Sequence, residues 1–195
     1  MMAAFSNSGF YKKLGKAGAA LVVAASVAAV PVIKKWEGRS LTPYYDIAGV
    51  LTYCDGETLN ARHGTQYTHE QCDALTQKRA LEFAEGVAAS LERPVSQKTF
   101  ESLIVFSYNV GLGNFRSSTA LRRINDGRTA EGCEAMMKFV CVTVAPGKGE
   151  TAQGKPCYST LKNKKFVQGL WNRRDEERQM CLAGIADDTI SSKFP

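Results

Sequence analysis

The hydrophobic pattern of the chain starts with one uninterrupted apolar run. Ala17–Ile33 contains 17 residues without a charge, which is at the lower limit for a helix that spans a membrane. Seven of these residues are alanine, so the run is only weakly hydrophobic. Lysines precede it and no acid does, which favours keeping its N-terminal side in the cytoplasm.

Three fates of this run are open. A cleaved signal peptide would end near Ser26-Val27-Ala28, where small residues stand at suitable offsets. A permanent anchor would be expected to contain more Leu, Ile and Phe. A weak anchor would export the chain uncleaved and later leave the bilayer. A buried core helix is not expected behind Lys12–Lys16, although the segment can pack on the domain after release.

Beyond this run, apolar periodicity and turn signals predict a small hairpin followed by helices. Val50–Cys54 has the β-branched and aromatic composition of a strand. Thr68 and Gln71 form a capping box that opens a helix running towards Glu92. The remaining expected elements are a central helix over Gln97–Val110 capped by Ser96, helices over Phe115–Asn125, Thr129–Val140 and Gln168–Leu182, a loop or hairpin over Val142–Pro156, and a frayed tail over Asp187–Pro195.

The net charge of +6 is concentrated at the N-terminus. The first 36 residues contain five lysines and no acid, so the rest of the chain is nearly neutral. A nucleic-acid-binding domain would carry a basic stripe on its folded surface. We therefore expect no nucleic-acid partner.

The six cysteines include no C-x-x-C pair, and the chain has only two histidines, so a zinc site is not expected. An even number of cysteines in an exported chain indicates disulfides. A nucleophilic Cys54 assisted by His63 is the less favoured reading. The expected pairs are Cys141 with Cys157, Cys54 with Cys72, and Cys133 with Cys181.

Candidate catalytic chemistry lies just after the apolar run. Glu37, Asp46 and Thr52 are separated by tight-turn residues, so they lie on a folded-back segment rather than on one helix face. Two carboxylates in different surroundings suit cleavage of a glycosidic bond, in which one donates a proton and the other positions water.

The residues around these groups extend the pattern. EG begins at Glu37, PYYD contains Asp46 and GVLT contains Thr52. With this spacing, the segment resembles the active-site segment of phage lysozymes of the T4 type, glycoside hydrolase family 24. The resemblance continues through Phe106–Asn125 and Gln168–Cys181. It implies an α+β, lysozyme-like fold with a small β-hairpin lobe and a larger helical lobe, joined by a long helix.

The resemblance also implies a function. Residues 36–195 would form a catalytic domain that hydrolyses the β-1,4 bond between N-acetylmuramic acid and N-acetylglucosamine in peptidoglycan. Glu37 would be the general acid, with Asp46 and Thr52 positioning water. Asn109 would either contact the sugar or simply cap the end of its helix before Gly111. No cofactor or metal is implied, and a monomer is expected.

Residues 1–35 resemble the signal-arrest-release segments of phage endolysins. Such a segment would tether the enzyme, inactive, to the host inner membrane through residues 17–33, and the released form would be active in the periplasm.

One residue departs from the family pattern. The family usually has Gly-His-Thr where this chain has Gly56-Glu57-Thr58. Glu57 is either a structural replacement that bonds the backbone, or a third acid near the substrate that raises the pKa of a neighbouring carboxyl. A lytic transglycosylase, a membrane-lesion protein and a non-catalytic cell-wall binder are the alternative functions.

Overall fold

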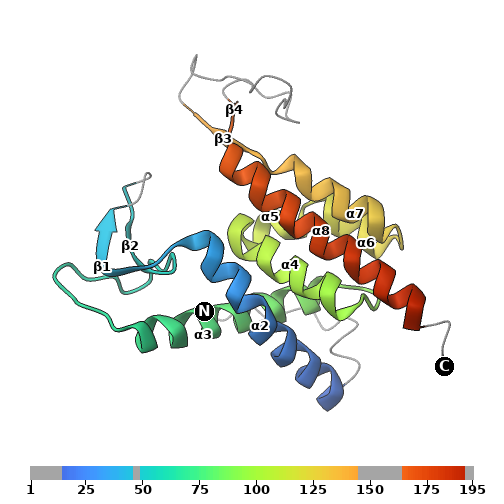
Figure 1. Ribbon diagram of the computed structural model, residues 1–195, viewed down its shortest axis with the longest axis horizontal. Coiled ribbons are helices and arrows are strands. Elements are labelled where there is room, and N and C mark those ends of the chain that lie inside the picture. The colour runs from blue at the N-terminus through green and yellow to red at the C-terminus, as the bar shows by residue number, and fades with distance from the viewer. Residues whose placement is uncertain (1–14, 46–48, 145–163, 192–195) are drawn as a thin grey trace.

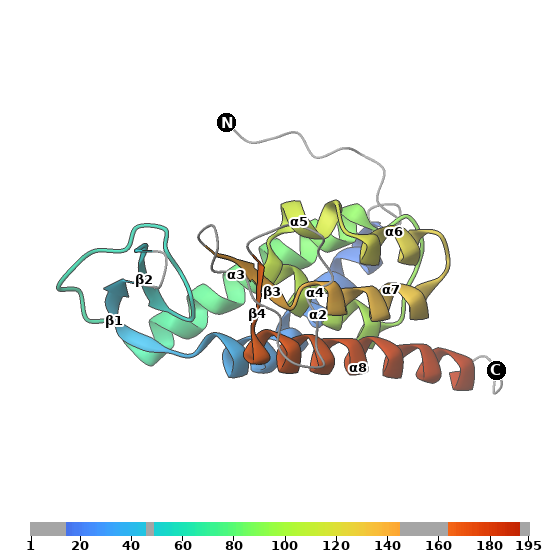
Figure 2. The same cartoon turned by 90° about the horizontal axis from the view of Figure 1, so that it is seen from above.

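A long helix, α3 (His69–Ser90), links a small β-hairpin lobe to a larger helical lobe (Figures 1 and 2). The computed structural model describes residues 15–45, 49–144 and 164–191, with side chains described as far as residue 186. The capping box that the sequence predicts opens α3, because Thr68 accepts from Gln71 N and the Gln71 side chain accepts from Thr68 N.

The small lobe is an antiparallel pair, β1 (Ser40–Tyr45) and β2 (Leu51–Cys54). Tyr44 lies opposite Thr52 in the register. The chain then turns back on itself after β2, where Tyr53 and Glu57 exchange two backbone hydrogen bonds of 2.8 and 2.9 Å. The expected disulfide between Cys54 and Cys72 fastens this turn to the first turn of α3.

The helical lobe is built around α4 (Gln97–Val110), with α2 (Gly15–Glu37), α3 and α8 (Gln168–Ser191) packed against it. Its segment Leu103–Phe106 is completely buried. Ser96 caps the helix by accepting from Thr99 N, as its position in the sequence predicts. Gly111 ends it with a φ of +83°, a conformation that glycine adopts without strain.

The apolar run forms most of α2 (Gly15–Glu37). Its small and apolar residues recur at helical spacing and pack on α3 and α4; the buried ones are Gly18, Val22, Ala25, Ser26, Ala29 and Ile33. Leu21, Val23 and Val27 face outward and stay exposed. The helix is long and apolar enough to cross a membrane, and here one stripe of it belongs to the core of the helical lobe.

The middle of the helical lobe is more broken than the sequence pattern predicts. A single helix over Phe115–Asn125 is wrong: the structure has α5 (Leu112–Arg116) and α6 (Thr119–Asn125). The break occurs because Ser118 caps α6, accepting from Leu121 N at 3.0 Å. The next predicted helix is also shorter, since α7 (Thr129–Ala135) passes into the 3-10 turn η1 (Met136–Lys138).

The C-terminal part contains a second hairpin and the last helix. β3 (Cys141–Thr143) pairs with β4 (Lys164–Phe166), so strands do pair here, but the second strand lies beyond the expected range Val142–Pro156. Cys141 is disulfide-bonded, while its expected partner Cys157 lies outside the described residues.

The last helix, α8 (Gln168–Ser191), is longer than expected. The prediction of a frayed tail is therefore wrong for the residues up to Ser191. Contacts with α4 continue past the expected end at Leu182. Thr99 Oγ1 donates to Cys181 O at 3.0 Å, and a side chain at Gly184 would collide with Ser96 and Thr99. The expected Cys133–Cys181 disulfide joins α8 to α7.

Candidate active site

Glu37 is the last residue of α2, and ion pairs of the preceding lysines hold this end of the helix in place. Lys34 Nζ lies 2.6 Å from Asp73 Oδ1 of α3. Lys35 Nζ lies 2.7 Å from Glu176 Oε1 of α8. The end of α2 is therefore fixed between the helix that carries the small lobe and the last helix of the helical lobe.

The Glu37 carboxylate lies between α8 and the turn after β2. Arg173 Nη1 of α8 is 2.7 Å from Glu37 Oε1. On the other side, a Cβ at Gly56 would come within 3.3 Å of Glu37 Oε2, and Gly56 has a φ of +89°. Glycine thus serves twice at this position, by adopting the turn and by leaving room for the carboxylate.

A pocket of about 210 Å³ opens beside Glu37 at the junction of the two lobes. It is formed by the turn after β2, the middle of α3 and the end of α4, and its lining residues are Glu37, Gly56, Glu57, Arg79, Phe83, Tyr108 and Asn109. Burial, reinforced by the negative charge of Glu37, raises the pKa of Tyr108, so its phenol stays protonated.

The structure brings three of the predicted site residues together at this pocket: Glu37, Glu57 and Asn109. Thr52 is buried in β2, where its Oγ1 donates to Val50 O at 3.0 Å. Asp46, which follows β1 in the sequence, lies outside the described residues.

Glu57 bonds the backbone, as the structural interpretation of this residue predicts. Its Oε1 accepts from Thr58 N at 2.9 Å and from Leu59 N at 2.8 Å. Its Oε2 lies 3.3 Å from Arg79 Nε of α3. Glu57 therefore closes the turn after β2 and joins it to α3.

The sequence analysis missed Arg39, which clamps the segment after Glu37. Arg39 Nε and Nη2 contact the buried carboxylate of Asp55 at 2.9 and 2.6 Å. Thr76 Oγ1 of α3 donates to the same carboxylate at 2.5 Å. The hydrogen bond with Asp55 raises the pKa of Arg39. No periodic pattern links these positions, which meet only through the fold.

A buried charged cluster on α8, formed by Arg173, Arg174 and Glu177, supports the site from the other side. Glu177 Oε1 accepts from Arg173 Nε at 3.2 Å and from Arg174 Nη2 at 2.7 Å. Spacings of three and four residues along α8 favour such arginine–acid pairs. The contact of Arg173 with Glu37, in contrast, arises only from the fold.

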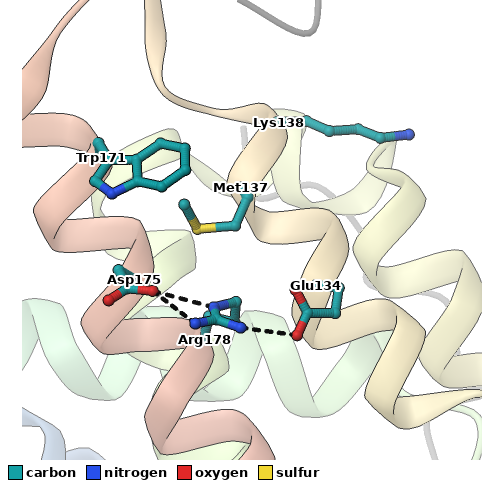
Figure 3. A pocket seen from close by; sticks show the side chains of 6 residues that line it. All are labelled: Glu134, Met137, Lys138, Trp171, Asp175 and Arg178. Atoms are coloured by element: carbon teal, nitrogen blue, oxygen red, sulfur yellow. Dashed lines mark hydrogen bonds and ion pairs between the residues drawn. The ribbon is translucent and has the colours of Figure 1, made fainter. Parts of the chain in front are cut away.

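A larger pocket, of about 370 Å³, lies between α8 and the α7–η1 segment (Figure 3). Trp171 and Met137 form its apolar part, and Arg178 bridges Asp175 and Glu134 beside it. Helical spacing places Trp171, Asp175 and Arg178 on the face of α8 opposite Arg173. This pocket is therefore separate from Glu37. Within the described ranges, no group of three or more His, Cys, Asp or Glu residues is placed to hold a metal ion.

Residues 34–177 match the model of the phage lysozyme family. The chain belongs to the phage lysozyme family. It is a lysozyme, a glycoside hydrolase, as the sequence analysis predicts.

Relatives of this lysozyme include phage proteins named SAR-endolysins. The one from Enterobacteria phage PA-2 is 37% identical over 149 residues, covering 76% of this chain and 78% of that protein. The one from Pseudomonas phage phiKMV is 35% identical over 159 residues, covering 82% and 89%. The chain functions as an endolysin.

Solved structures agree with the lysozyme-like fold. The endolysin from Escherichia coli O157:H7 phage FAHEc1 has a TM-score of 0.66 and 28% identity, covering 79% of this chain and 90% of that one. The muramidase domain of SpmX from Asticaccaulis excentricus has a TM-score of 0.68 and 28% identity, covering 80% and 95%. The active form of the P1 phage endolysin Lyz, at 20% identity and a TM-score of 0.65, covers 86% and 94% and supports the fold alone.

Proposed function

We propose that this lysozyme hydrolyses the β-1,4 bond between N-acetylmuramic acid and N-acetylglucosamine in peptidoglycan, with Glu37 as the general acid. The observation that carries the proposal is the position of Glu37. Its carboxylate is fixed at the end of α2, beside the pocket at the junction of the lobes, and is held by Arg173. A general acid must be positioned in this way before it can protonate a leaving oxygen.

Asp46 and Thr52 complete the proposed chemistry. Glu37 protonates the leaving oxygen, while Asp46 directs water to the opposite face of the sugar, which inverts the anomeric carbon. The Thr52 hydroxyl donates a hydrogen bond to Val50 O. Its lone pairs therefore remain available to accept a hydrogen bond from that water.

Asn109 and Glu57 are the proposed contacts to the sugar, and the structure supports them unequally. Both line the pocket. Glu57 already accepts two backbone hydrogen bonds and faces Arg79. Asn109 stands two residues before the helix-ending Gly111, where a polar side chain can reach a ligand in the pocket. Asn109 is thus the stronger candidate for recognition.

The N-terminal segment, residues 1–35, is proposed to tether the enzyme to the host inner membrane before release into the periplasm. The apolar length of α2 supports this, as does the similarity to SAR-endolysins. One continuous helix crosses the proposed boundary with the catalytic domain, residues 36–195, and ends at Glu37. The position of the proposed acid therefore depends on where this helix lies.

The test is hydrolysis of purified peptidoglycan by Glu37→Gln. Loss of the general acid should lower turnover by about 10²–10⁴-fold while the enzyme remains folded. Glu82→Gln is the matched control, because it removes an exposed carboxylate on α3 whose partner is Arg79. Near-normal turnover in Glu37→Gln would show that another group is the acid.

The masses of the products test the reaction type. Hydrolysis leaves a reducing end, whereas a lytic transglycosylase leaves an anhydro sugar that is lighter by one water. Asp46→Asn and Thr52→Ala should both lose activity if water is positioned as proposed. If the Asp46→Asn enzyme were fully active and formed anhydro products, the reaction would be transglycosylation and not hydrolysis.

A further inference from the structure

Buried polar atoms without a hydrogen-bond partner gather at the contact between Glu37 and α8. In the described part of the chain they are Glu37 Oε1, Arg173 Nη2, Arg174 Nε and Nη1, and Glu177 Oε2. Glu37 Oε1 nevertheless lies 2.7 Å from Arg173 Nη1, so this contact is an ion pair without good hydrogen-bond angles. Charge, more than hydrogen bonding, therefore determines the properties of this cluster.

Glu177 is the centre of the cluster. It is fully buried, three and four residues after the two arginines, so all three side chains share one face of α8. Its Oε1 contacts Arg173 through Nε, which leaves Nη1 of the same guanidinium to face Glu37. The chain of contacts thus runs from Glu177 through Arg173 to Glu37.

The charges in this cluster balance. Arg173 and Arg174 contribute two positive charges, and Glu177 and Glu37 contribute two negative charges when both are ionised. Arg174 is fully buried with its guanidinium 5.0 Å from the ring of Phe106, so water screens it poorly. Without Glu177, two cations would act on Glu37, and nearby positive charge favours the ionised form of a carboxyl.

We propose that Glu177 is a positioning residue for the acid. It holds Arg173 against Glu37 and offsets the charge of both arginines, so the net charge that faces the Glu37 carboxyl depends on Glu177. The inference rests on the proposed role of Glu37 as the general acid.

The surroundings of Glu177 support this assignment. Burial raises its pKa to about 7, with both arginines opposing the change. Its negative charge is therefore most complete on the alkaline side of neutrality, where an acid catalyst loses its proton. Glu37 faces the cluster from α2 and Phe106 from α4.

The other charged groups near these side chains lie on other elements and do not contact Glu177. Arg79, Glu57 and the Tyr108 phenol line the pocket with Glu37. Glu134 and Lys138, from α7 and η1, line the pocket on the opposite face of α8.

The experiment compares two substitutions of opposite charge effect in the full chain. Glu177→Gln keeps the shape of the side chain and removes a negative charge, whereas Arg174→Gln removes a positive charge. Activity on purified peptidoglycan is measured against pH, with kcat and KM separated. We expect the alkaline limb of the kcat profile to move to lower pH in Glu177→Gln and to higher pH in Arg174→Gln. A displacement of one pH unit corresponds to about a tenfold change in kcat on that limb.

Asp175→Asn is the matched control. It removes a carboxylate from the same helix, but Asp175 pairs with Arg178 on the opposite face. Its pH profile should equal that of the wild type. KM should change little in any of the three variants, because none of these residues lines the pocket beside Glu37.

A purely structural role would lower thermal stability and total activity while leaving both limbs in place, and would overturn the inference. The inference would also be overturned if the alkaline limb of the kcat profile moved in the same direction in Glu177→Gln and Arg174→Gln. If one variant fails to fold, the direction of the other still decides. Glu37→Gln separates the two proposals. An active Glu37→Gln enzyme would show that Glu37 is not the acid. An inactive Glu37→Gln enzyme, with unchanged pH profiles in the other variants, would contradict only the role of Glu177.

Discussion

Glu57 Oε2 and Arg79 Nε lie 3.3 Å apart and join the turn after β2 to α3 beside the pocket of Glu37. The family usually has an imidazole where this chain has Glu57. Here the anchoring charge is negative and its partner on α3 is positive. The same carboxylate also accepts from two backbone N–H groups of the turn. Glu57 thus fastens the small lobe to the long helix.

Substitutions at Glu57 should separate this anchoring role from chemistry. Glu57→Ala loses two backbone hydrogen bonds and should lower the free energy of unfolding by about 1–3 kcal/mol. Glu57→Gln can still accept those bonds, so its loss should be smaller, and its turnover should stay within about tenfold of the wild type. Denaturant unfolding and peptidoglycan hydrolysis measure the two effects. If Glu57→Gln lost as much turnover as Glu37→Gln, Glu57 would take part in catalysis.

The two described disulfides should differ in effect because they close loops of different length. Cys54–Cys72 spans 18 residues and Cys133–Cys181 spans 48. The chain-entropy model gives stabilisation of about 3 and about 4 kcal/mol respectively. Replacing both cysteines of a pair by alanine should therefore lower the free energy of unfolding more for the longer loop.

Activity should show the reverse order, since Cys54 borders the turn that contacts Glu37 and Cys133–Cys181 lies among the helices. Equal loss of activity in both double variants would contradict a special link between the shorter loop and the site.

The buried carboxylate of Glu177 should make stability depend on pH. Burial raises its pKa from 4.5 to about 7. The folded state therefore binds this proton more tightly than the unfolded state. The resulting stabilisation is complete below about pH 4.5 and is lost as the pH rises to about 7, with a size of roughly 3 kcal/mol. The free energies of unfolding of wild type and Glu177→Gln, measured between pH 4.5 and 8, should differ by an amount that changes in this direction. A constant difference would show that Glu177 does not titrate in this range.

Local sequence signals explain why the hairpin, the caps and the position of Glu37 could be predicted. The Thr68–Gln71 box and the Ser96 cap involve residues three positions apart, so their geometry follows from the nearby chain. The break between α5 and α6 at Ser118 could not be predicted, because serine also occurs inside helices. The length of α8 depends on its contact with α4 and could not be read from its own composition.

Ion pairs also divide into those set by nearby residues, which can be predicted, and those set by the fold, which cannot. Arg178 pairs with Asp175 and Arg174 with Glu177 within one turn of α8, and such pairs can be expected from spacing. Lys35 pairs with Glu176 across a sequence separation of 141 residues. The approach of Arg173 to Glu37 is likewise a product of the fold. Glu37 could be singled out from the sequence, but the cations that surround its carboxylate could not.

The two faces of α2 allow membrane anchoring and packing on the domain to be tested separately. Ala25 and Ala29 are completely buried against the helical lobe. Ala24 and Ala28 lie on the exposed face of the same helix. Replacing either pair by leucine adds the same apolar surface to the segment. Only the buried pair must then find room in the packed state, where overpacking typically costs about 1–3 kcal/mol.

We therefore expect different outcomes from the two leucine pairs. Ala24→Leu with Ala28→Leu should be as stable and active as the wild type when purified. In exporting cells it should remain in the membrane after the membrane potential is collapsed, whereas the full-length wild type moves to the soluble periplasmic fraction. The potential contributes about 2.3 kcal/mol per charge per 100 mV, which is comparable to the margin of a weak anchor. Ala25→Leu with Ala29→Leu should be retained similarly, but the purified protein should be less stable and less active, because the helix that carries Glu37 no longer packs well. Release of the outer-face variant together with the wild type would contradict the anchoring role, and a wild type shortened by about 28 residues before the collapse would show a cleaved signal peptide instead.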